Sequence, residues 1–268
     1  MASFDVKDLA RRLHEVGAGY YCITVMQGTR HMLAPNATYD AVCGTKPGEA
    51  CATRDLIWEL SDALAKYDID LCLYYTGDGP HADPVCGSAF GFVDPRGNVT
   101  EEFVRKWASV LREYAVRYGS RVKAWIIDGC YRKYFGYTDE LMSLLYDACK
   151  AGNPDCLVAM NDGLEAGFGK NYPGEELTFG EFNDFTDFAP ARFIDGAQAH
   201  ILAPLGIDDQ DCCRWCRKGA RLDGKYMLDY VKKANARGMV VSIDTFVDYD
   251  GSWDPEQTAV LKYIGDHL

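Results

Sequence analysis

The sequence contains no apolar run that approaches the ~20 residues of a membrane-spanning helix, so we expect no membrane partner. Its opening residues, Met1 to Asp5, carry neither a basic nor an apolar segment. No signal peptide is therefore expected, although a trimmed leader would leave the same picture. The HExxH, phosphate-loop, GxSxG and dinucleotide-binding motifs are also missing. The sequence does not indicate the enzyme classes that these motifs define.

Basic side chains are few relative to acidic ones. The chain has 28 Lys and Arg against 40 Asp and Glu, which gives a formal net charge of -12. Because an acidic protein repels phosphate backbones, we expect no nucleic-acid partner. A neutral or cationic substrate is accommodated more easily.

The 11 cysteines are odd in number and scattered along the chain. Several fall inside predicted strands or helices, where a free cysteine acts as a small apolar residue: Cys22, Cys72, Cys149 and Cys156. This pattern favours a reduced, cytoplasmic protein over a disulfide scaffold. Cys213 and Cys216 have the CxxC spacing of some zinc and redox sites, but no second pair follows. We therefore expect a plain thiol cluster and neither a metal nor an organic cofactor.

Short apolar runs alternate with longer amphipathic stretches. The runs are mostly continuous, which is typical of strands buried on both faces. The predicted strands are Tyr20–Met26, Ile69–Thr76, Val122–Asp128, Cys156–Asp162, Leu177–Phe182, Ala197–Ala203 and Met239–Phe246. Helices are expected around residues 6–16, 56–67, 100–119, 141–148, 223–237 and 254–264. The last has the clearest start, since Asp254 can cap it, Pro255 suits its first turn and Gln257 can reach back to the cap.

The strand–helix order predicts an α/β fold with parallel strands and right-handed crossovers. We expect one domain over residues 1–268, because no linker divides the chain. A TIM-like (β/α) barrel is favoured over an open doubly wound sheet, since no glycine-rich phosphate loop follows the first strand. With seven recognisable strands the barrel is expected to be incomplete. A missing strand would leave open sheet edges, through which two copies could form a homodimer.

In a barrel, functional groups lie at the carboxyl ends of the strands. The candidates there are Gln27, His31, Tyr75, Asp128, Asn161, Asp162, Glu181, His200, Asp244 and, in the last loop, Trp253. Carboxylates outnumber the other titratable groups, and aromatic residues make up 13% of the chain. Glycoside hydrolysis needs two carboxyl groups that flank one bond, so a carbohydrate substrate is expected.

Asp128 is the sharpest single candidate. It follows three bulky apolar residues, Trp125 to Ile127, which hold its carboxylate at the end of a strand, and Gly129 allows the chain to turn. The alternative is an aspartate that only caps a helix or a turn. The other candidates also have structural alternatives. His31 can be packed or solvent-facing, and His200 can be a core histidine.

The roles of two aromatic candidates, Trp253 and Tyr75, depend on which way their side chains face. Trp253 can be a sugar platform or a hydrophobic plug. Tyr74 and Tyr75 must point to opposite faces of their strand, because side chains alternate.

Several segments resemble the retaining α-L-fucosidase family of glycoside hydrolases, in the same order over almost the whole chain. They are Phe4–Thr24, Thr53–Thr76, Trp125–Gly129, Asn161–Asp162 and Val240–Leu268. The family's Trp-Phe-Asp-Gly segment carries the nucleophile, so the resemblance implies that role for Asp128 and a covalent glycosyl-aspartate intermediate. For the acid/base, Glu181 fits the family's spacing best, with Asp184 and Asp187 as competitors.

The sequence differs from the family mainly at positions that bind the sugar in the family. The family's first strand has no counterpart, and its fucose-binding histidine pair falls on Gln27 and Gly28. The arginine that follows its Asn-Asp pair is Gly163 here. The resemblance thus supports the fold and the chemistry better than fucose as the substrate. A non-catalytic carbohydrate-binding or interaction protein is the main alternative, and a barrel lyase or epimerase is a third.

Overall fold

The protein is described by a computed structural model that covers residues 3–93, 97–163, 166–207 and 214–268. Its main sheet has parallel strands in chain order: β1 (Tyr20–Thr24), β2 (Asp70–Thr76), β3 (Val122–Asp128) and β4 (Leu157–Met160). The remaining strands form a parallel pair, β7 (His200–Pro204) and β8 (Val240–Asp244), and a short antiparallel hairpin, β5 (Phe193–Ile194) and β6 (Ala197–Gln198). The predicted α/β class with parallel strands is confirmed.

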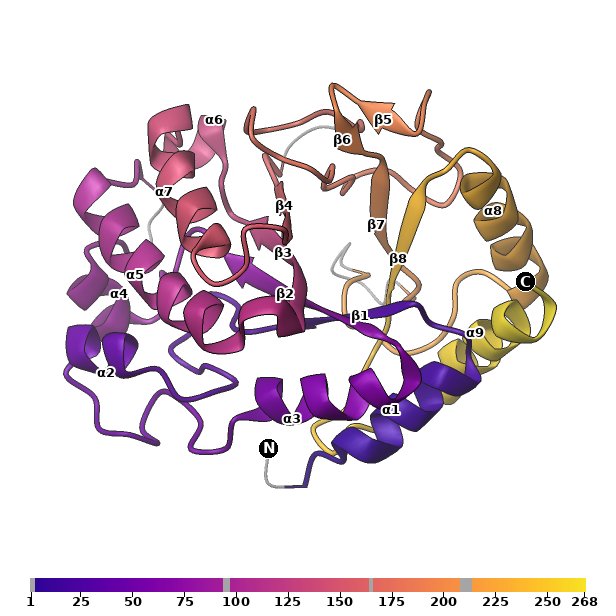
Figure 1. Ribbon diagram of the computed structural model, residues 1–268, viewed down its shortest axis with the longest axis horizontal. Coiled ribbons are helices and arrows are strands. Elements are labelled where there is room, and N and C mark those ends of the chain that lie inside the picture. The colour runs from indigo at the N-terminus through magenta and orange to yellow at the C-terminus, as the bar shows by residue number, and fades with distance from the viewer. Residues whose placement is uncertain (1–2, 94–96, 164–165, 208–213) are drawn as a thin grey trace.

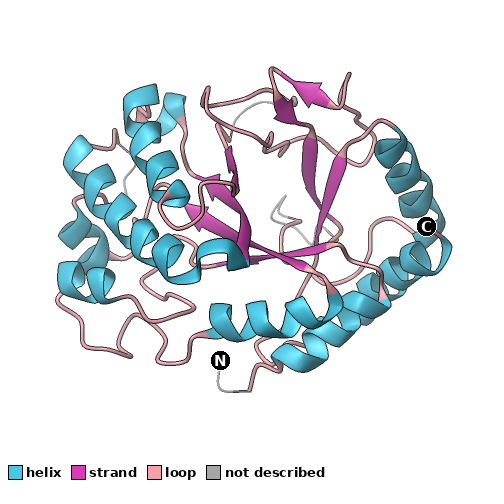
Figure 2. Cartoon of the chain, viewed as in Figure 1, coloured by secondary structure: helices cyan, strands magenta, loops and turns pink. Residues whose placement is uncertain are grey.

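Helices lie outside the strands, as Figure 2 shows. Those that the sequence predicts are α1 (Val6–Glu15), α3 (Leu56–Leu64), α5 (Glu101–Tyr118), α7 (Asp139–Lys150), α8 (Gly224–Ala236) and α9 (Pro255–His267). Short helices that it does not predict are α2 (Ala37–Cys43), α4 (Pro84–Phe90) and α6 (Arg132–Phe135), with 3₁₀ turns at Ala65–Tyr67 and Gly119–Arg121. These are too short to show an apolar stripe. No helix in the described part of the chain is long and apolar enough to cross a membrane.

The start of α9 confirms one expected cap and corrects another. Asp254 accepts hydrogen bonds from the backbone nitrogens of Glu256 and Gln257, both at 3.1 Å, as an N-cap should. The Gln257 side chain does not reach back to the cap. Its oxygen accepts from Phe246 at 2.7 Å, so it joins α9 to the loop after β8.

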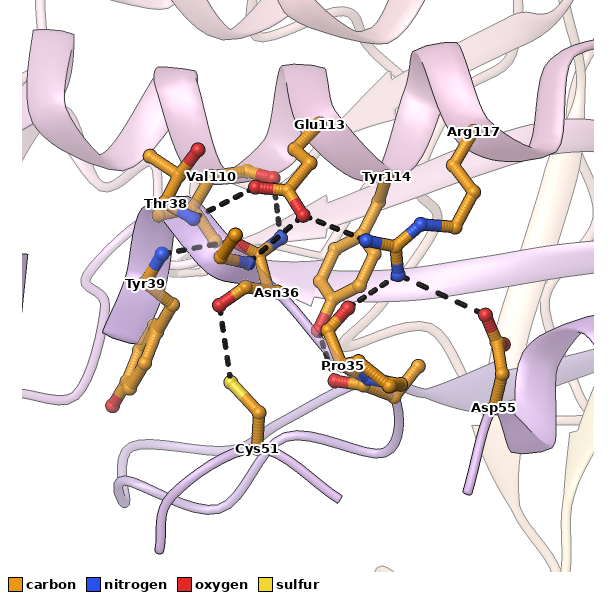
Figure 3. Close-up of polar contacts among 12 residues, drawn as sticks. Pro35, Asn36, Thr38, Tyr39, Cys51, Asp55, Val110, Glu113, Tyr114 and Arg117 are labelled. Atoms are coloured by element: carbon orange, nitrogen blue, oxygen red, sulfur yellow. Dashed lines mark hydrogen bonds and ion pairs between the residues drawn. The ribbon is translucent and has the colours of Figure 1, made fainter. Parts of the chain in front are cut away.

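A polar network joins α2 to the long helix α5 (Figure 3). Glu113 of α5 accepts hydrogen bonds from the backbone nitrogens of Ala37 and Thr38 at 2.9 and 2.8 Å, which satisfies the open N-terminus of α2. Arg117, one turn further along α5, pairs with Glu113 at 2.6 Å and donates to the carbonyl of Pro35. The segment after β1 is thereby held against the helix layer.

Alternation along β3 decides which side chains face inward. Trp125 and Ile127 are buried in the large core between the sheet and its helices. Ala124 and Ile126 belong to a separate small core on the other face of the sheet. Asp128 follows in the same register as Ala124 and Ile126, so its carboxylate lies on the inner face at the carboxyl end of the strand.

The strands are arranged around this inner face, as Figure 1 shows. Beyond β4, the backbone nitrogen of Leu177 donates to Val158 of β4 at 3.4 Å, and that of Thr178 donates to Gln198 of β6 at 3.0 Å. The predicted strand Leu177–Phe182 is thus reduced to one bridge between Leu177 and Gln198, and the prediction for the rest of it is wrong. The predicted strand Ala197–Ala203 is divided into β6 and β7.

One side chain of β1 joins the sheet edge at β1 to the edge at β8. The Tyr20 hydroxyl of β1 donates to the carbonyl of Val241 in β8 at 2.8 Å and lies 2.7 Å from the Ser242 hydroxyl. Among the described residues, no backbone ladder pairs β1 with β8. A closed barrel therefore stays a prediction, as does the homodimer expected at this edge.

Candidate active site

Asp128 is the centre of a group of polar side chains on the inner face of the sheet. Its side chain is buried, with the residue 7% exposed. Tyr74 of β2 donates a hydrogen bond to Asp128 Oδ2. Tyr131, from the turn before α6, donates to Oδ1 at 2.9 Å, and Asn161, just after β4, donates to the same oxygen at 2.8 Å. Three protein donors therefore converge on the Asp128 carboxyl group.

Asn161 joins this carboxylate to a second one. Its amide oxygen accepts from the backbone nitrogen of Gly163 at 3.0 Å, which turns its amide nitrogen toward the carboxyl groups. That nitrogen donates to Asp128 Oδ1 and also to Glu181 Oε2. Two oxygens bound to one nitrogen are at most about 6 Å apart, since each hydrogen bond is about 3 Å long. The carboxyl groups of Asp128 and Glu181 therefore form a close pair.

The environment of Glu181 differs from that of Asp128. Burial, together with the neighbouring Asp128 charge, raises the pKa of Glu181 to about 8, while the hydrogen bond from Asn161 acts in the opposite direction. Glu181 is consequently protonated at neutral pH. The site thus holds a protonated carboxyl group beside a second carboxyl group that accepts three hydrogen bonds, and general acid catalysis by a carboxyl pair requires one protonated member.

A pocket of about 190 Å³ opens on the Glu181 side of this pair. Its lining residues are Glu181, Phe182, Asn183, Asp184, Pro204, Arg214, Trp215 and Arg221. Phe182 has a left-handed backbone with φ of 63°, and its side chain is 58% exposed. Bulky residues rarely adopt this conformation.

The sequence left two other carboxylates as candidates for the acid/base. Asp184 is in an ion pair with Arg221 of the pocket wall, and Asp187 accepts a hydrogen bond from the backbone nitrogen of Asp184 at 2.9 Å. The structure therefore brings Glu181, and not these two, into contact with the group around Asp128.

Tyr75 is one candidate that the structure corrects. It is fully buried on the helix side of the sheet, where its ring stacks on Trp107 at 4.8 Å. Tyr74 occupies the inner face instead. Its place follows from the register, since Thr76 pairs with Asp128 and Tyr74 lies on the same face as Thr76. Tyr131 is a residue that sequence reasoning missed, because no motif marks it.

His200 and Trp253 are also structural. His200 is 2% exposed, and its Nδ1 contacts the carbonyls of Thr178 and Phe179 at 3.0 and 2.9 Å. Its Nε2 lies 2.7 Å from the Ser242 hydroxyl, so both ring nitrogens are used inside the protein. Trp253 is 9% exposed and packs in the large core. Both side chains are buried, so their positions do not favour substrate binding by these two, which stays a prediction.

The remaining candidates lie near the strand ends. Gln27 and His31 are exposed in the loop after β1, and Asp162 is exposed beside Asn161. No hydrogen bond from Gln27 or His31 to the two carboxyl groups is found within the described ranges. Burial raises the pKa of Asp244 to about 6, and its carboxylate accepts from the backbone nitrogen of Cys216 at 2.8 Å.

The structure also bears on metal binding. Among the described residues, no cluster of three or more His, Cys, Asp or Glu is placed to hold a metal ion. The CxxC spacing ends at Cys216, which is exposed, while its first cysteine, Cys213, lies outside the described residues.

No family model matches the sequence, and the search of curated proteins finds no relative. Solved structures do match. An endo-fucoidan hydrolase from glycoside hydrolase family 107 has a TM-score of 0.79 at 14% identity, covering 99% of this chain and 50% of its own. An α-L-fucosidase of family GH29 from Bacteroides thetaiotaomicron has a TM-score of 0.66 at 18% identity, covering 98% and 60%. An α-L-fucosidase from Lactobacillus casei has a TM-score of 0.66 at 16% identity, covering 98% and 79%.

These similarities concern the fold. The chain has the fold of fucose-acting glycoside hydrolases, and it spans about half the length of the endo-fucoidan hydrolase. The part of the predicted resemblance that concerns this fold is confirmed.

Proposed function

We propose that the protein is a retaining glycoside hydrolase in which Asp128 is the nucleophile and Glu181 the acid/base. The observation that carries this is the shared nitrogen of Asn161, which holds the carboxyl groups of Asp128 and Glu181 together. Retaining enzymes place the two groups about 5–5.5 Å apart, whereas inverting enzymes need about 6.5–9.5 Å. The upper limit of about 6 Å set by two hydrogen bonds to one atom favours retention.

The reaction has two steps. Asp128 attacks the anomeric carbon while the bond to the leaving oxygen breaks, and Glu181 gives its proton to that oxygen. A glycosyl-aspartate ester results. Water then attacks the same carbon and gives its proton to Glu181, and the carbon–aspartate bond breaks, which restores both carboxyl groups. No metal or organic cofactor takes part in this scheme.

The placement of the pocket supports these roles. Glu181 forms part of the pocket wall, so a leaving group seated there would present its oxygen to the acid. The exposed Phe182 supplies an aromatic face, and the partly exposed Arg221–Asp184 pair supplies a polar wall, which together suit a sugar ring. The substrate class we propose is accordingly a saccharide with a sugar on each side of the bond.

The names of the similar solved structures indicate which sugar to test first as a substrate. They are named as fucosidases and fucoidan hydrolases, and the Bacteroides protein is described as a trapped covalent intermediate. Fucosides therefore come first, although the residues at Gln27, Gly28 and Gly163 differ from the fucosidase pattern.

The test is hydrolysis of a panel of nitrophenyl glycosides that includes α-L-fucoside. We expect turnover of at least one of them with retained anomeric configuration, and complete loss in Asp128→Asn. Asp70→Asn is a matched control, because Asp70 is an exposed aspartate at the opposite end of β2. Hydrolysis that survives in Asp128→Asn would overturn the mechanism.

A non-catalytic carbohydrate-binding protein is the second candidate. It is favoured by the three hydrogen bonds from protein donors to the Asp128 oxygens, which a purely structural carboxyl group would also make. Binding to a glycan without turnover of any member of the panel would support it.

A further inference from the structure

The hydrogen bonds at Asp128 are divided unequally between its two oxygens. Oδ1 accepts from both Tyr131 and Asn161, at 2.9 and 2.8 Å, whereas Oδ2 accepts from Tyr74. A carboxylate offers about two acceptor sites on each oxygen. Both sites on Oδ1 are therefore used, and one site on Oδ2 is left for a new bond.

The place of the Tyr131 ring is specified by its neighbours. It stacks on Phe135 with ring centroids 5.3 Å apart and an interplanar angle of 8°. On its other side lies Gly163, where a Cβ atom would stand 2.0 Å from Tyr131 Cε1. Gly163 also has a left-handed φ of 68°. Any larger residue at 163 would displace the ring, so the contact between Tyr131 and Oδ1 requires the glycine.

We propose that Oδ2 is the attacking atom and that Tyr131 is a positioning residue for the second step, the hydrolysis of the glycosyl-aspartate. This inference rests on the proposed function. In the ester, Oδ2 is bonded to the anomeric carbon and Oδ1 is the carbonyl oxygen. Tyr131 and Asn161 then donate to that carbonyl oxygen.

The charge moves in opposite directions in the two steps. In the first, the electron pair of the glycosidic bond goes to the leaving oxygen, which takes the Glu181 proton, so the negative charge of Asp128 ends on Glu181. In the second, water adds to the anomeric carbon, its proton goes to Glu181, and the electron pair of the carbon–Oδ2 bond returns to the carboxylate. Part of this charge gathers on Oδ1, where a preorganised donor stabilises it. Loss of the Tyr131 hydroxyl therefore slows the second step, and it does not slow the attack by Oδ2.

The variant that tests this is Tyr131→Phe, which keeps the ring and removes the hydroxyl. With an activated nitrophenyl glycoside that the wild type turns over, we expect kcat to fall about 10–100-fold, the effect of a lost bond to a charged group. KM should fall with it, so that kcat/KM changes by no more than about threefold. A pre-steady-state burst of nitrophenol and a protein mass increased by one glycosyl group should accompany the change.

The control and a second variant separate the possible causes. Tyr75→Phe removes a buried hydroxyl from the adjacent position, on the helix side of the strand, and should give neither burst nor adduct. Gly163→Ala, if folded, should reproduce the behaviour of Tyr131→Phe, because it displaces the ring.

The outcomes distinguish the two proposals. If Asp128→Asn abolishes turnover but Tyr131→Phe lowers kcat and kcat/KM equally without an adduct, or leaves kcat unchanged, only the role of Tyr131 is overturned. If no glycoside is hydrolysed by the wild type, the proposed function and this inference both fall.

Discussion

Asn161 donates a hydrogen bond to Glu181 from the same amide nitrogen that binds Asp128. One side chain thus limits the separation of the two carboxyl groups and also lowers the pKa of one of them, against the larger effects of burial and of Asp128. The amide is held in this orientation by the backbone nitrogen of Gly163, which donates to its oxygen at 3.0 Å. The catalytic proposal depends on this contact between side chains from the ends of different strands.

Replacement of Asn161 by alanine should lower kcat/KM about 10–100-fold, because a hydrogen bond to a charged carboxylate is lost. It should also move the alkaline limb of the pH–rate profile to higher pH. The reason is that the Asn161 hydrogen bond lowers the pKa of Glu181, so its removal raises that pKa further. The pH dependence of kcat/KM measures both effects. A limb that moves to lower pH would contradict the assignment of Glu181 as the acid.

The pKa of Glu181 predicts the pH at which the alkaline limb of the pH–rate profile lies in the wild type. The acid works only when protonated, and its pKa is raised to about 8, so kcat/KM should fall as the pH rises through about 8. In Glu181→Gln this limb should vanish, and hydrolysis of substrates with poor leaving groups should be lost first. Asp184→Asn is the matched control, since Asp184 is paired with Arg221 and should not remove the limb. A limb that disappears in Asp184→Asn would transfer the acid role to that residue.

The strand that carries Asp128 could be predicted from the sequence to the residue, and Val122–Asp128 is β3. A continuous apolar run followed by Asp-Gly is a local signal, and it is sufficient when both faces of the strand are buried. The inner position of Tyr74 could also have been deduced, but only with the register of β2 against β3, which is a contact between distant segments.

Other parts of the site depend on the tertiary structure. The run Leu177–Phe182 is apolar enough for a strand, but Gly180 and Phe182 have positive φ values of 73° and 63°, which end the extended conformation. Glu181 lies between these two residues, at the bend. The role of Tyr131 depends on a glycine 32 positions later in the chain, at Gly163, and no local pattern connects the two.

Glu175 gives a stability prediction outside the catalytic pair. It is 3% exposed, and one oxygen accepts from the backbone nitrogens of Asn171 and Tyr172 at 3.0 and 2.7 Å, while the other finds no hydrogen-bond partner among the described residues. Burial raises its pKa from 4.5 to about 8. Since the folded state holds the proton more tightly than the unfolded state, stability from this group is present below pH 4.5 and is lost as the pH rises toward 8.

Glu175→Gln keeps an acceptor oxygen and removes the titration. Relative to the wild type, its free energy of unfolding should therefore rise by several kcal/mol between pH 4.5 and pH 8. Denaturant unfolding at several pH values measures this difference. Glu176→Gln is the matched control and should lose stability at neutral pH, because Glu176 pairs with Lys150 at 2.7 Å. A constant difference between Glu175→Gln and the wild type would refute the prediction.

His200 should destabilise the protein at low pH, whereas Glu175 should destabilise it at high pH. Its burial lowers its pKa from 6.5 to about 4, and the carbonyls of Thr178 and Phe179 only partly offset this. Between pH 6.5 and pH 4 the unfolded state therefore binds a proton at His200 that the folded state does not bind. The free energy of unfolding consequently decreases by up to about 3 kcal/mol as the pH falls from 6.5 toward 4. His200→Gln should be less stable than the wild type at pH 7, because the ring contacts are lost, yet its free energy of unfolding should fall less steeply with acid. Because the carboxylates titrate in both proteins, the difference between the two curves isolates His200. Parallel curves between pH 7 and pH 4 would mean that the pKa of His200 is the same in the folded and unfolded states, which would refute the prediction.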